Sequence, residues 1–257
     1  LIGQPDRRVF DIIASKTACD VGSVWLDDNR LQSAISLRPS VTLSLYAHPF
    51  SSYCQKVQIA FYENATPFTY RLLGPEDPAA MEERQALWPL GRFPVVVDDG
   101  VTVVESSIII EHLQLFHPGP VKLLPDDPKA ALKVRFLDRF FDNYVMTPMQ
   151  VPVFEAIRPD GGRKEAMAEA AVALDTAYQW LEAHLDGPWA AGEDFTMADC
   201  AAAASLFYAD WVRPIGETFP KVRAYRARLL ARPSISRCVE EGRPYRHFFP
   251  LGAPDRD

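Results

Sequence analysis

The sequence predicts a small α/β domain followed by an all-helical domain. Between Val41 and Phe116, β-rich runs alternate with helical patterns. Beyond the Pro- and Asp-rich segment "HPGPVKLLPDDP", strand signals fade and helical periodicity dominates. The composition, 48% hydrophobic and 24% charged over 257 residues, is that of a globular chain long enough to bury a sizeable core.

The first half of the chain predicts strand, helix, strand, helix, and then two strands and a helix. "VTLSLY" is β-branched and alternating, and the following "SSYCQKVQIAFYE" places Cys54, Val57 and Phe61 on one helical face. "PFTYRLL" predicts the second strand and "PAAMEERQALW" the second helix. "FPVVVDDGVTVVES" predicts a hairpin around the turn "DDG", and "SSIIIEHLQLF" predicts the third helix. This order implies a mixed sheet, because the crossover makes parallel strands and the hairpin an antiparallel pair.

The second half predicts amphipathic helices. The segment "KAALKVRFLDRFFDNY" repeats apolar residues at helical spacing, at Leu132, Phe136, Phe140 and Tyr144. Residues 163–185 carry a similar repeat. "DFTMADCAAAASLFYA" opens with a capping box formed by Thr196 and Asp199 and is apolar nearly all round, so we expect this helix to be the buried centre of the helical domain.

The shifts in pattern give domain boundaries. Residues 1–40 have mixed polarity and no sustained period, so they are expected to be an N-terminal extension whose composition allows disorder. The expected units after it are the α/β domain at 41–118, a linker at 119–128, the helical domain at 129–250 and a tail at 251–257.

Charge and motifs exclude several classes of function. The net charge of −7 argues against a nucleic-acid binder, and the absence of Gly-rich phosphate-binding motifs argues against a nucleotide cofactor. The sequence contains no run of about 18 apolar residues, so no membrane span is predicted. The four cysteines form no C-x-x-C spacing, which favours a reducing, cytoplasmic compartment, and the five histidines show no metal-ligand spacing, so no metal is expected.

Four segments, taken in order, resemble the cytosolic glutathione transferase family: "SSYCQKVQIAF", "GRFPVV", "ESSIIIEHL" and "WAAGEDFTMADCAAAA". The resemblance covers about Val41 to Phe249 and implies a thioredoxin-like domain followed by a helical bundle. The first segment is most similar to the serine-type classes, zeta in particular. It also aligns with the Cys-Pro motif of omega-type relatives, so that Ser51 falls where those relatives carry a catalytic cysteine. The resemblance further implies glutathione as co-substrate, a small electrophilic substrate and a homodimer.

Ser51 is the candidate catalytic residue. A free thiol has a pKa near 8.5, so a transferase must stabilise the thiolate, and a helix N-terminus with a serine hydroxyl at its edge supplies hydrogen bonds to an anion. The alternative is that Ser51 or Ser52 only caps the helix. Cys54, about one turn further on, has two alternatives: packing in the core, or a redox role through a mixed disulfide.

The resemblance also places the remaining glutathione contacts. Phe93-Pro94 resembles the family's cis-proline dipeptide, whose first residue pairs its backbone with the cysteinyl unit of glutathione. With Ser106 as N-cap of the third helix, its hydroxyl and the nearby amides suit a carboxylate and the preceding Glu105 suits an ammonium group. The other candidate glutathione contacts are Ser51, Ser52, Arg92 and, as further candidates, Gln55 and Lys56.

The acceptor substrate is expected at the loop after the first strand and along the first long helix of the second half, which offer Phe50, Phe140, Phe141 and Tyr144. Aromatic residues at helical spacing also serve as core. The resemblance implies transfer of an alkyl or aryl group to the glutathione sulfur, as in detoxification. The alternatives are a glutathione-dependent isomerase or thiol-disulfide reductase at the same site, or a non-catalytic binding or assembly module on this fold.

Overall fold

The computed structural model of the protein describes residues 43–257. The predicted N-terminal extension, 1–40, lies outside the described residues. The expected α/β order is confirmed. Its elements are β1 (Leu43–Ala47), α1 (Ser52–Glu63), β2 (Thr69–Leu72), α2 (Pro78–Leu87), β3 (Val95–Asp98), β4 (Val101–Val104) and α3 (Ser106–Phe116).

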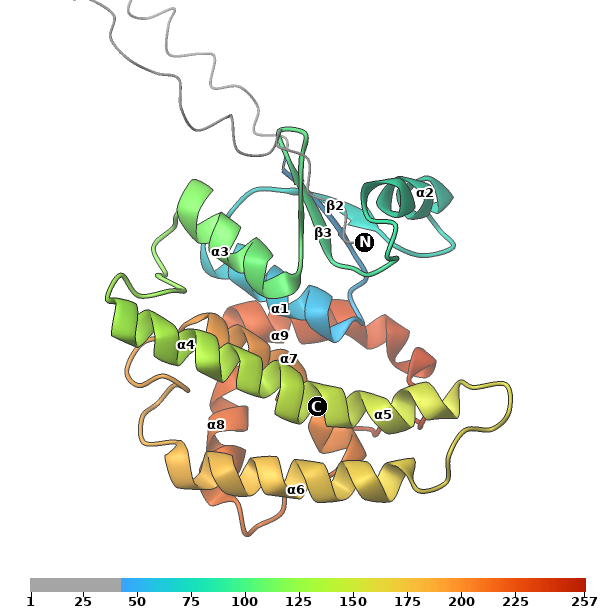
Figure 1. Ribbon diagram of the computed structural model, residues 1–257, viewed down its shortest axis with the longest axis vertical. Helices are drawn as coiled ribbons and strands as arrows, with labels where there is room; N and C mark the ends of the chain where they lie inside the picture. Colours follow the sequence, from blue (N-terminus) through green and yellow to red (C-terminus); the bar gives the residue numbers. More distant parts are fainter. Residues whose placement is uncertain (1–42) are drawn as a thin grey trace, which may run out of the picture. The chain divides into compact units, whose positions relative to one another are not determined.

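The four strands form one mixed sheet in the order β2-β1-β3-β4, parallel between β1 and β2 and antiparallel elsewhere. Helices α1 and α3 cover one face and α2 covers the other (Figure 1). Alternate residues of β1 serve the two faces, because successive strand side chains point in opposite directions. Leu43 and Leu45 join the main core with α1 and α3, whereas Tyr46 packs with Leu73 and Ala80 in a smaller cluster under α2.

The strand register brings three chain segments to one edge of the sheet. Val95, the first residue of β3, pairs with Tyr46 near the end of β1 and with Val104 at the end of β4. The chain therefore leaves β1, enters β3 and leaves β4 at the same edge. Helices α1 and α3 both begin there, so their positive N-terminal ends share that edge as well.

The second half is helical, as predicted. Its elements are α4 (Pro128–Phe140), a π-helical segment η4 (Phe141–Met146), α5 (Thr147–Ala156), α6 (Ala166–His184), α7 (Met197–Val212), α8 (Pro220–Leu230), α9 (Pro233–Gly242) and a 3₁₀ segment η5 (Arg243–Phe248). Together with the sheet, they match the predicted fold class of a thioredoxin-like domain and an all-α domain. Of the described helices, none combines the length and the apolar composition that a membrane span requires.

Helix α7 is the buried centre of the helical half (Figure 1). Every residue from Met197 to Asp210 is buried. The predicted capping box is confirmed: the Asp199 carboxylate accepts a hydrogen bond from the Thr196 amide at 2.8 Å. The same carboxylate accepts further bonds from the Ala190 amide at 2.8 Å and the Tyr225 hydroxyl at 2.6 Å. The cap thus holds two further segments on α7.

The apolar repeat predicted for the helix after the linker is the exposed side of α4 and η4. Of its four members only Phe140 is buried, while Leu132, Phe136 and Tyr144 are 67%, 51% and 59% exposed. A second stripe is buried in its place, at Ala131, Val134, Leu137, Asp138 and Phe141. The sequence carries two apolar stripes on this helix, and packing against α7 selects the one that includes an acidic residue.

Candidate active site

The loop between β1 and α1 is a tight turn held by its own backbone. The Ser51 amide donates to the His48 carbonyl oxygen at 3.0 Å, and the Phe50 amide donates to His48 Nδ1 at 3.1 Å. Burial lowers the pKa of His48 below its ordinary value, and Glu76 opposes this effect. The imidazole is therefore neutral when Nδ1 accepts the Phe50 amide.

Two side chains from outside the turn fix its other carbonyl groups. Gln55 Nε2 donates to the Pro49 carbonyl oxygen at 2.9 Å, and the Tyr208 hydroxyl of α7 donates to the Phe50 carbonyl oxygen at 2.9 Å. Gln55, a further candidate for glutathione contact, is buried, and its amide group binds this loop. These bonds preorganise the loop that carries Ser51.

Ser51 occupies the N-cap position of α1, but its side chain makes no capping hydrogen bond. The hydroxyl instead acts on the nearby Cys54 thiol, whose pKa it lowers. Since the first turn of α1 also lacks an acidic residue, the positive end of the helix is not compensated there. Ser52, the other candidate cap, is the first residue of α1 and is buried.

Cys54 is completely buried, together with Val57 and Phe61 on the predicted face of α1. Burial raises the pKa of its thiol to about 12, against the smaller opposite effects of the Ser51 hydroxyl and the His48 backbone. The thiol is thus protonated at neutral pH. Its surroundings are those of a core cysteine and disfavour the thiolate that redox exchange requires.

The Phe93-Pro94 peptide bond is cis. Pro94 is buried and Phe93 is 40% exposed. Within residues 43–257, the backbone amide and carbonyl groups of Phe93 have no hydrogen-bond partner. The neighbouring Arg92 is exposed. The sheet edge therefore presents a free donor and acceptor of the main chain beside the end of β1.

The start of α3 differs from the prediction by one residue: Glu105 is the N-cap and Ser106 is the first helical residue. Glu105 has a φ of 69°, a positive value that is uncommon for a residue other than glycine. It occurs here at the turn between β4 and α3. Such a backbone costs about 1–3 kcal/mol and is found mostly at functional sites. Of the described residues, none forms a hydrogen bond with the exposed Glu105 carboxylate or with the Ser106 hydroxyl.

A buried charge network lies behind the first turn of α3. Lys56 Nζ is 2.6 Å from Asp138 Oδ1 and 2.8 Å from Asp142 Oδ2, and it donates to Ser107 Oγ at 2.9 Å. Ser107 Oγ in turn donates to Asp138 Oδ2 at 2.6 Å, and Arg139 pairs with both carboxylates from the exposed side. Lys56, a further candidate glutathione contact, is thus turned away into an interior ion pair that ties α1 and α3 to α4.

Two segments of the sequence match family models. Residues 45–120 match the N-terminal domain of glutathione S-transferases and residues 144–233 match the C-terminal domain. Glutathione S-transferase 1 of Manduca sexta is 30% identical over 57% of this chain and 68% of its own length. The chain belongs to the glutathione S-transferase family.

The chain is also similar to a curated relative and to a solved structure. Maleylacetoacetate isomerase of Rattus norvegicus is 27% identical over 58% of this chain and 68% of its own length. The solved structure of a glutathione S-transferase from Methylobacterium radiotolerans, in complex with glutathione sulfonate, has a TM-score of 0.65. It is 30% identical and covers 77% of this chain and 94% of that one.

The aromatic residues expected to bind the acceptor of a glutathione transferase lie in two separate clusters. Phe50 is half-buried against α7, with its ring 5.4 Å from that of Tyr208. Phe140 is buried with its ring 4.3 Å from Trp180 and 5.5 Å from Tyr144, which is exposed on the π-helical segment. Phe141, the fourth candidate, is completely buried. The structure therefore does not bring these residues together around one cavity.

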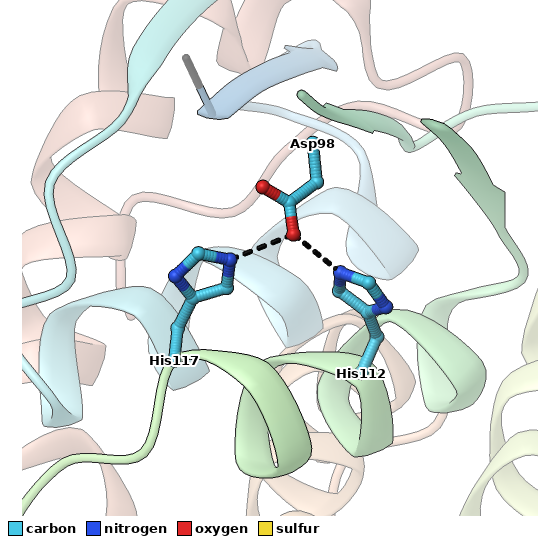
Figure 2. A group of neighbouring side chains, drawn as sticks. All are labelled: Asp98, His112 and His117. Atoms are coloured by element: carbon cyan, nitrogen blue, oxygen red, sulfur yellow. Dashed lines mark hydrogen bonds and ion pairs between the residues drawn. The ribbon is translucent and has the colours of Figure 1, made fainter. Parts of the chain in front are cut away.

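The structure also brings together three residues that sequence spacing did not indicate. Asp98, the last residue of β3, lies against His112 of α3 and His117 at the C-cap of the same helix (Figure 2). Two histidines five apart on a continuous helix would point about 140° away from one another. His117 has left the helical conformation, with a φ of −132°, so both imidazoles reach the same carboxylate.

Proposed function

We propose that this protein binds glutathione at the sheet edge formed by the ends of β1 and β4 and the start of β3, and directs its thiolate at small apolar electrophiles. One observation carries the proposal. The strand register brings four groups to this edge: the Ser51 hydroxyl, the backbone of Phe93 and the side chains of Glu105 and Ser106. Each of these groups can still form a hydrogen bond with a ligand.

The γ-glutamyl end of glutathione is a zwitterion, and the start of α3 offers a group for each charge. The Glu105 carboxylate can receive the ammonium group, while the Ser106 hydroxyl and the first amides of α3 can receive the carboxylate. The main-chain groups of Phe93 pair with the cysteinyl unit. Arg92 is exposed beside them and supplies a positive charge for the remaining, glycyl carboxylate.

The thiol of glutathione then lies over the N-terminus of α1. A thiol with an ordinary pKa near 8.5 is only a few per cent ionised at neutral pH. The unpaired first amides of α1 and the Ser51 hydroxyl stabilise its thiolate, which lowers that pKa and raises the concentration of the nucleophile. Attack on an alkyl or aryl electrophile forms the carbon–sulfur bond of the conjugate as the leaving group departs with the bonding electrons.

Cys54 has a packing role in this proposal. Because its thiol stays protonated, it competes only weakly with the glutathione thiolate for the Ser51 hydroxyl hydrogen. We do not propose a disulfide cycle, because the thiol is buried in the core.

A second candidate function is a glutathione-dependent isomerase. It is favoured by the relative from Rattus norvegicus, which is named as a maleylacetoacetate isomerase. An isomerase would use the same activated thiolate, but glutathione would be released unchanged. Product analysis separates the two: a transferase consumes one glutathione per turnover, whereas an isomerase converts its substrate at constant glutathione concentration. A non-catalytic module would do neither.

Ser106→Ala tests the proposed ligand site directly. Loss of a hydrogen bond to a charged group costs about 1.5–3 kcal/mol, so calorimetry should show glutathione binding weakened by roughly tenfold to a hundredfold. Ser236→Ala, which removes an exposed hydroxyl from α9, is the matched control and should bind like the wild type. Equal affinity in Ser106→Ala would place the ligand elsewhere and refute the proposal.

We also propose a cytoplasmic homodimer. Its support is a set of exposed apolar side chains on neighbouring helices, at Ile108, Leu115 and Phe116 of α3 and Leu132 and Phe136 of α4. Covering these side chains with a second copy removes them from water. Sedimentation that shows only monomer at micromolar concentration would contradict the dimer.

A further inference from the structure

We propose that Asp98, His112 and His117 form a binding site for a divalent transition-metal cation of the zinc class, at the junction between the β3–β4 hairpin and the end of α3. These three side chains come from different positions in the sequence but meet at one point, and none of them belongs to the proposed glutathione site.

The three donor atoms already converge. Both imidazoles aim Nε2 at the same Asp98 oxygen, Oδ2, at 2.7 Å each (Figure 2). All three donor atoms lie within 4.8 Å of one another. A tetrahedral zinc ion with bonds of about 2.0–2.1 Å separates its ligand atoms by about 3.4 Å. Small side-chain rotations that move the two rings outward therefore suffice to admit the ion.

The donor set favours zinc-class cations over calcium and magnesium. Imidazole nitrogen suits Zn²⁺ and its neighbours in the first transition row, whereas Ca²⁺ and Mg²⁺ prefer all-oxygen sites. Two histidines and one carboxylate leave the fourth position of a tetrahedral ion to water. The imidazoles of His112 and His117 are 15% and 17% exposed, so a cation can enter from solvent.

The carboxylate carries the negative charge that the cation needs. Burial alone would raise the pKa of Asp98, but hydrogen bonds from His117 and His112 outweigh it and hold that pKa below its ordinary value. Without metal, the rings share their Nε2 hydrogens with Oδ2. Binding a metal through Nε2 requires each ring to give up the hydrogen on that atom.

The position of the site indicates a structural clamp. Asp98 ends β3, at the opposite end of the strand from Pro94, and the two histidines belong to the last part of α3, whose first turn holds Ser106. A cation here would join the turn of the hairpin to the end of α3. The two elements that carry candidate glutathione contacts would thereby be fixed to each other at their far ends.

Titration of the chelator-treated full-length protein with Co²⁺ and with Zn²⁺ tests the site. We expect one ion per chain at micromolar concentration and a tetrahedral Co²⁺ absorption spectrum. His117→Gln and Asp98→Asn should each lower the metal affinity by at least roughly tenfold to a hundredfold. This is the loss usually seen when only a hydrogen-bond partner of a metal ligand is changed. His184→Gln is the matched control, because His184 stacks on Trp180 outside the cluster.

Thermal melting supplies a second measurement. A ligand that binds only the folded state raises Tm, so Zn²⁺ should raise the Tm of the wild type and of His184→Gln but not that of His117→Gln. The proposal is overturned if His117→Gln, shown folded by circular dichroism, binds Co²⁺ as the wild type does. It is also overturned if the wild type binds no ion, in which case the cluster only joins β3 to α3 by hydrogen bonds.

Discussion

Replacing Ser51 by alanine removes one hydrogen bond from the proposed thiolate and leaves the helix amides in place. The hydroxyl makes no capping bond to α1, so the substitution should not destabilise the helix. A hydrogen bond to a charged group contributes about 1.5–3 kcal/mol, which corresponds to a rise of roughly one to two units in the pKa of the bound thiol. At neutral pH the thiolate fraction falls in proportion, and conjugation should slow by about tenfold or more.

The assay is the rate of conjugation as a function of pH for the wild type, Ser51→Ala and Cys54→Ala. Part of the loss in Ser51→Ala should be recovered at alkaline pH, where the thiol ionises without help. Cys54→Ala should stay within about threefold of the wild type, because a protonated thiol interacts only weakly with the Ser51 hydroxyl. Its Tm must be measured as well, since truncating a core side chain can destabilise the fold.

Two results would refute this reasoning. If Ser51→Ala conjugates at the wild-type rate at neutral pH, the hydroxyl does not hold the sulfur, and the helix amides or another residue must do so. If Cys54→Ala abolishes turnover of disulfide substrates while Ser51→Ala leaves it unchanged, the site performs thiol-disulfide exchange through the buried cysteine.

Three further predictions concern the supports of the site. Tyr208→Phe should lower glutathione affinity and the rate of conjugation with little change in Tm, because it removes one hydrogen bond of about 0.5–1.5 kcal/mol from the loop that carries Ser51. An unchanged affinity would show that the loop keeps its conformation without this hydrogen bond. Asp199→Ala should lower the free energy of unfolding by at least about 2 kcal/mol, since several donors lose a buried acceptor, and urea denaturation with an unchanged midpoint would contradict this. His48 has a lowered pKa, so its contribution to stability is full above about pH 6.5 and is lost as the pH falls through its folded value. His48→Asn, which keeps an acceptor for the Phe50 amide but does not titrate, should therefore show a flatter dependence of Tm on pH below about pH 6.5, and identical curves for both proteins would disprove the assignment.

The parts of the fold that local patterns determine were predictable from the sequence. The "DDG" turn, the buried face of α1 and the capping box of Thr196 and Asp199 all depend on residues within a few positions of one another. The cap of α3 was placed one residue late, because the sequence does not reveal that Glu105 adopts a positive φ. The apolar repeat noted for α4 lies mostly on the exposed side of the helix, and periodicity alone cannot decide which of two apolar faces is buried.

The supports of the candidate site could not be predicted, because their partners are distant in the sequence. Tyr208 lies 158 positions from the carbonyl group it binds, and Lys56 lies 86 positions from Asp142. Lysine on a helix is ordinarily exposed, and only the folding of α4 and η4 next to Lys56 supplies the carboxylates that make its burial tolerable. The cluster of Asp98 with two histidines similarly depends on how the hairpin meets α3.

The buried Lys56 makes the stability of each half of the chain depend on the sequence of the other half. Its carboxylate partners both belong to the helical half, so a chain cut within the linker would leave an ammonium group on α1 without them. Removing one side of a buried ion pair costs about 3–5 kcal/mol, a large share of the stability of a small domain. A chimaera that joins this α/β half to a foreign helical half should fold only when the newcomer brings acidic residues to the positions of Asp138 and Asp142. We therefore expect recombined chains to fold only when their two halves match at these positions.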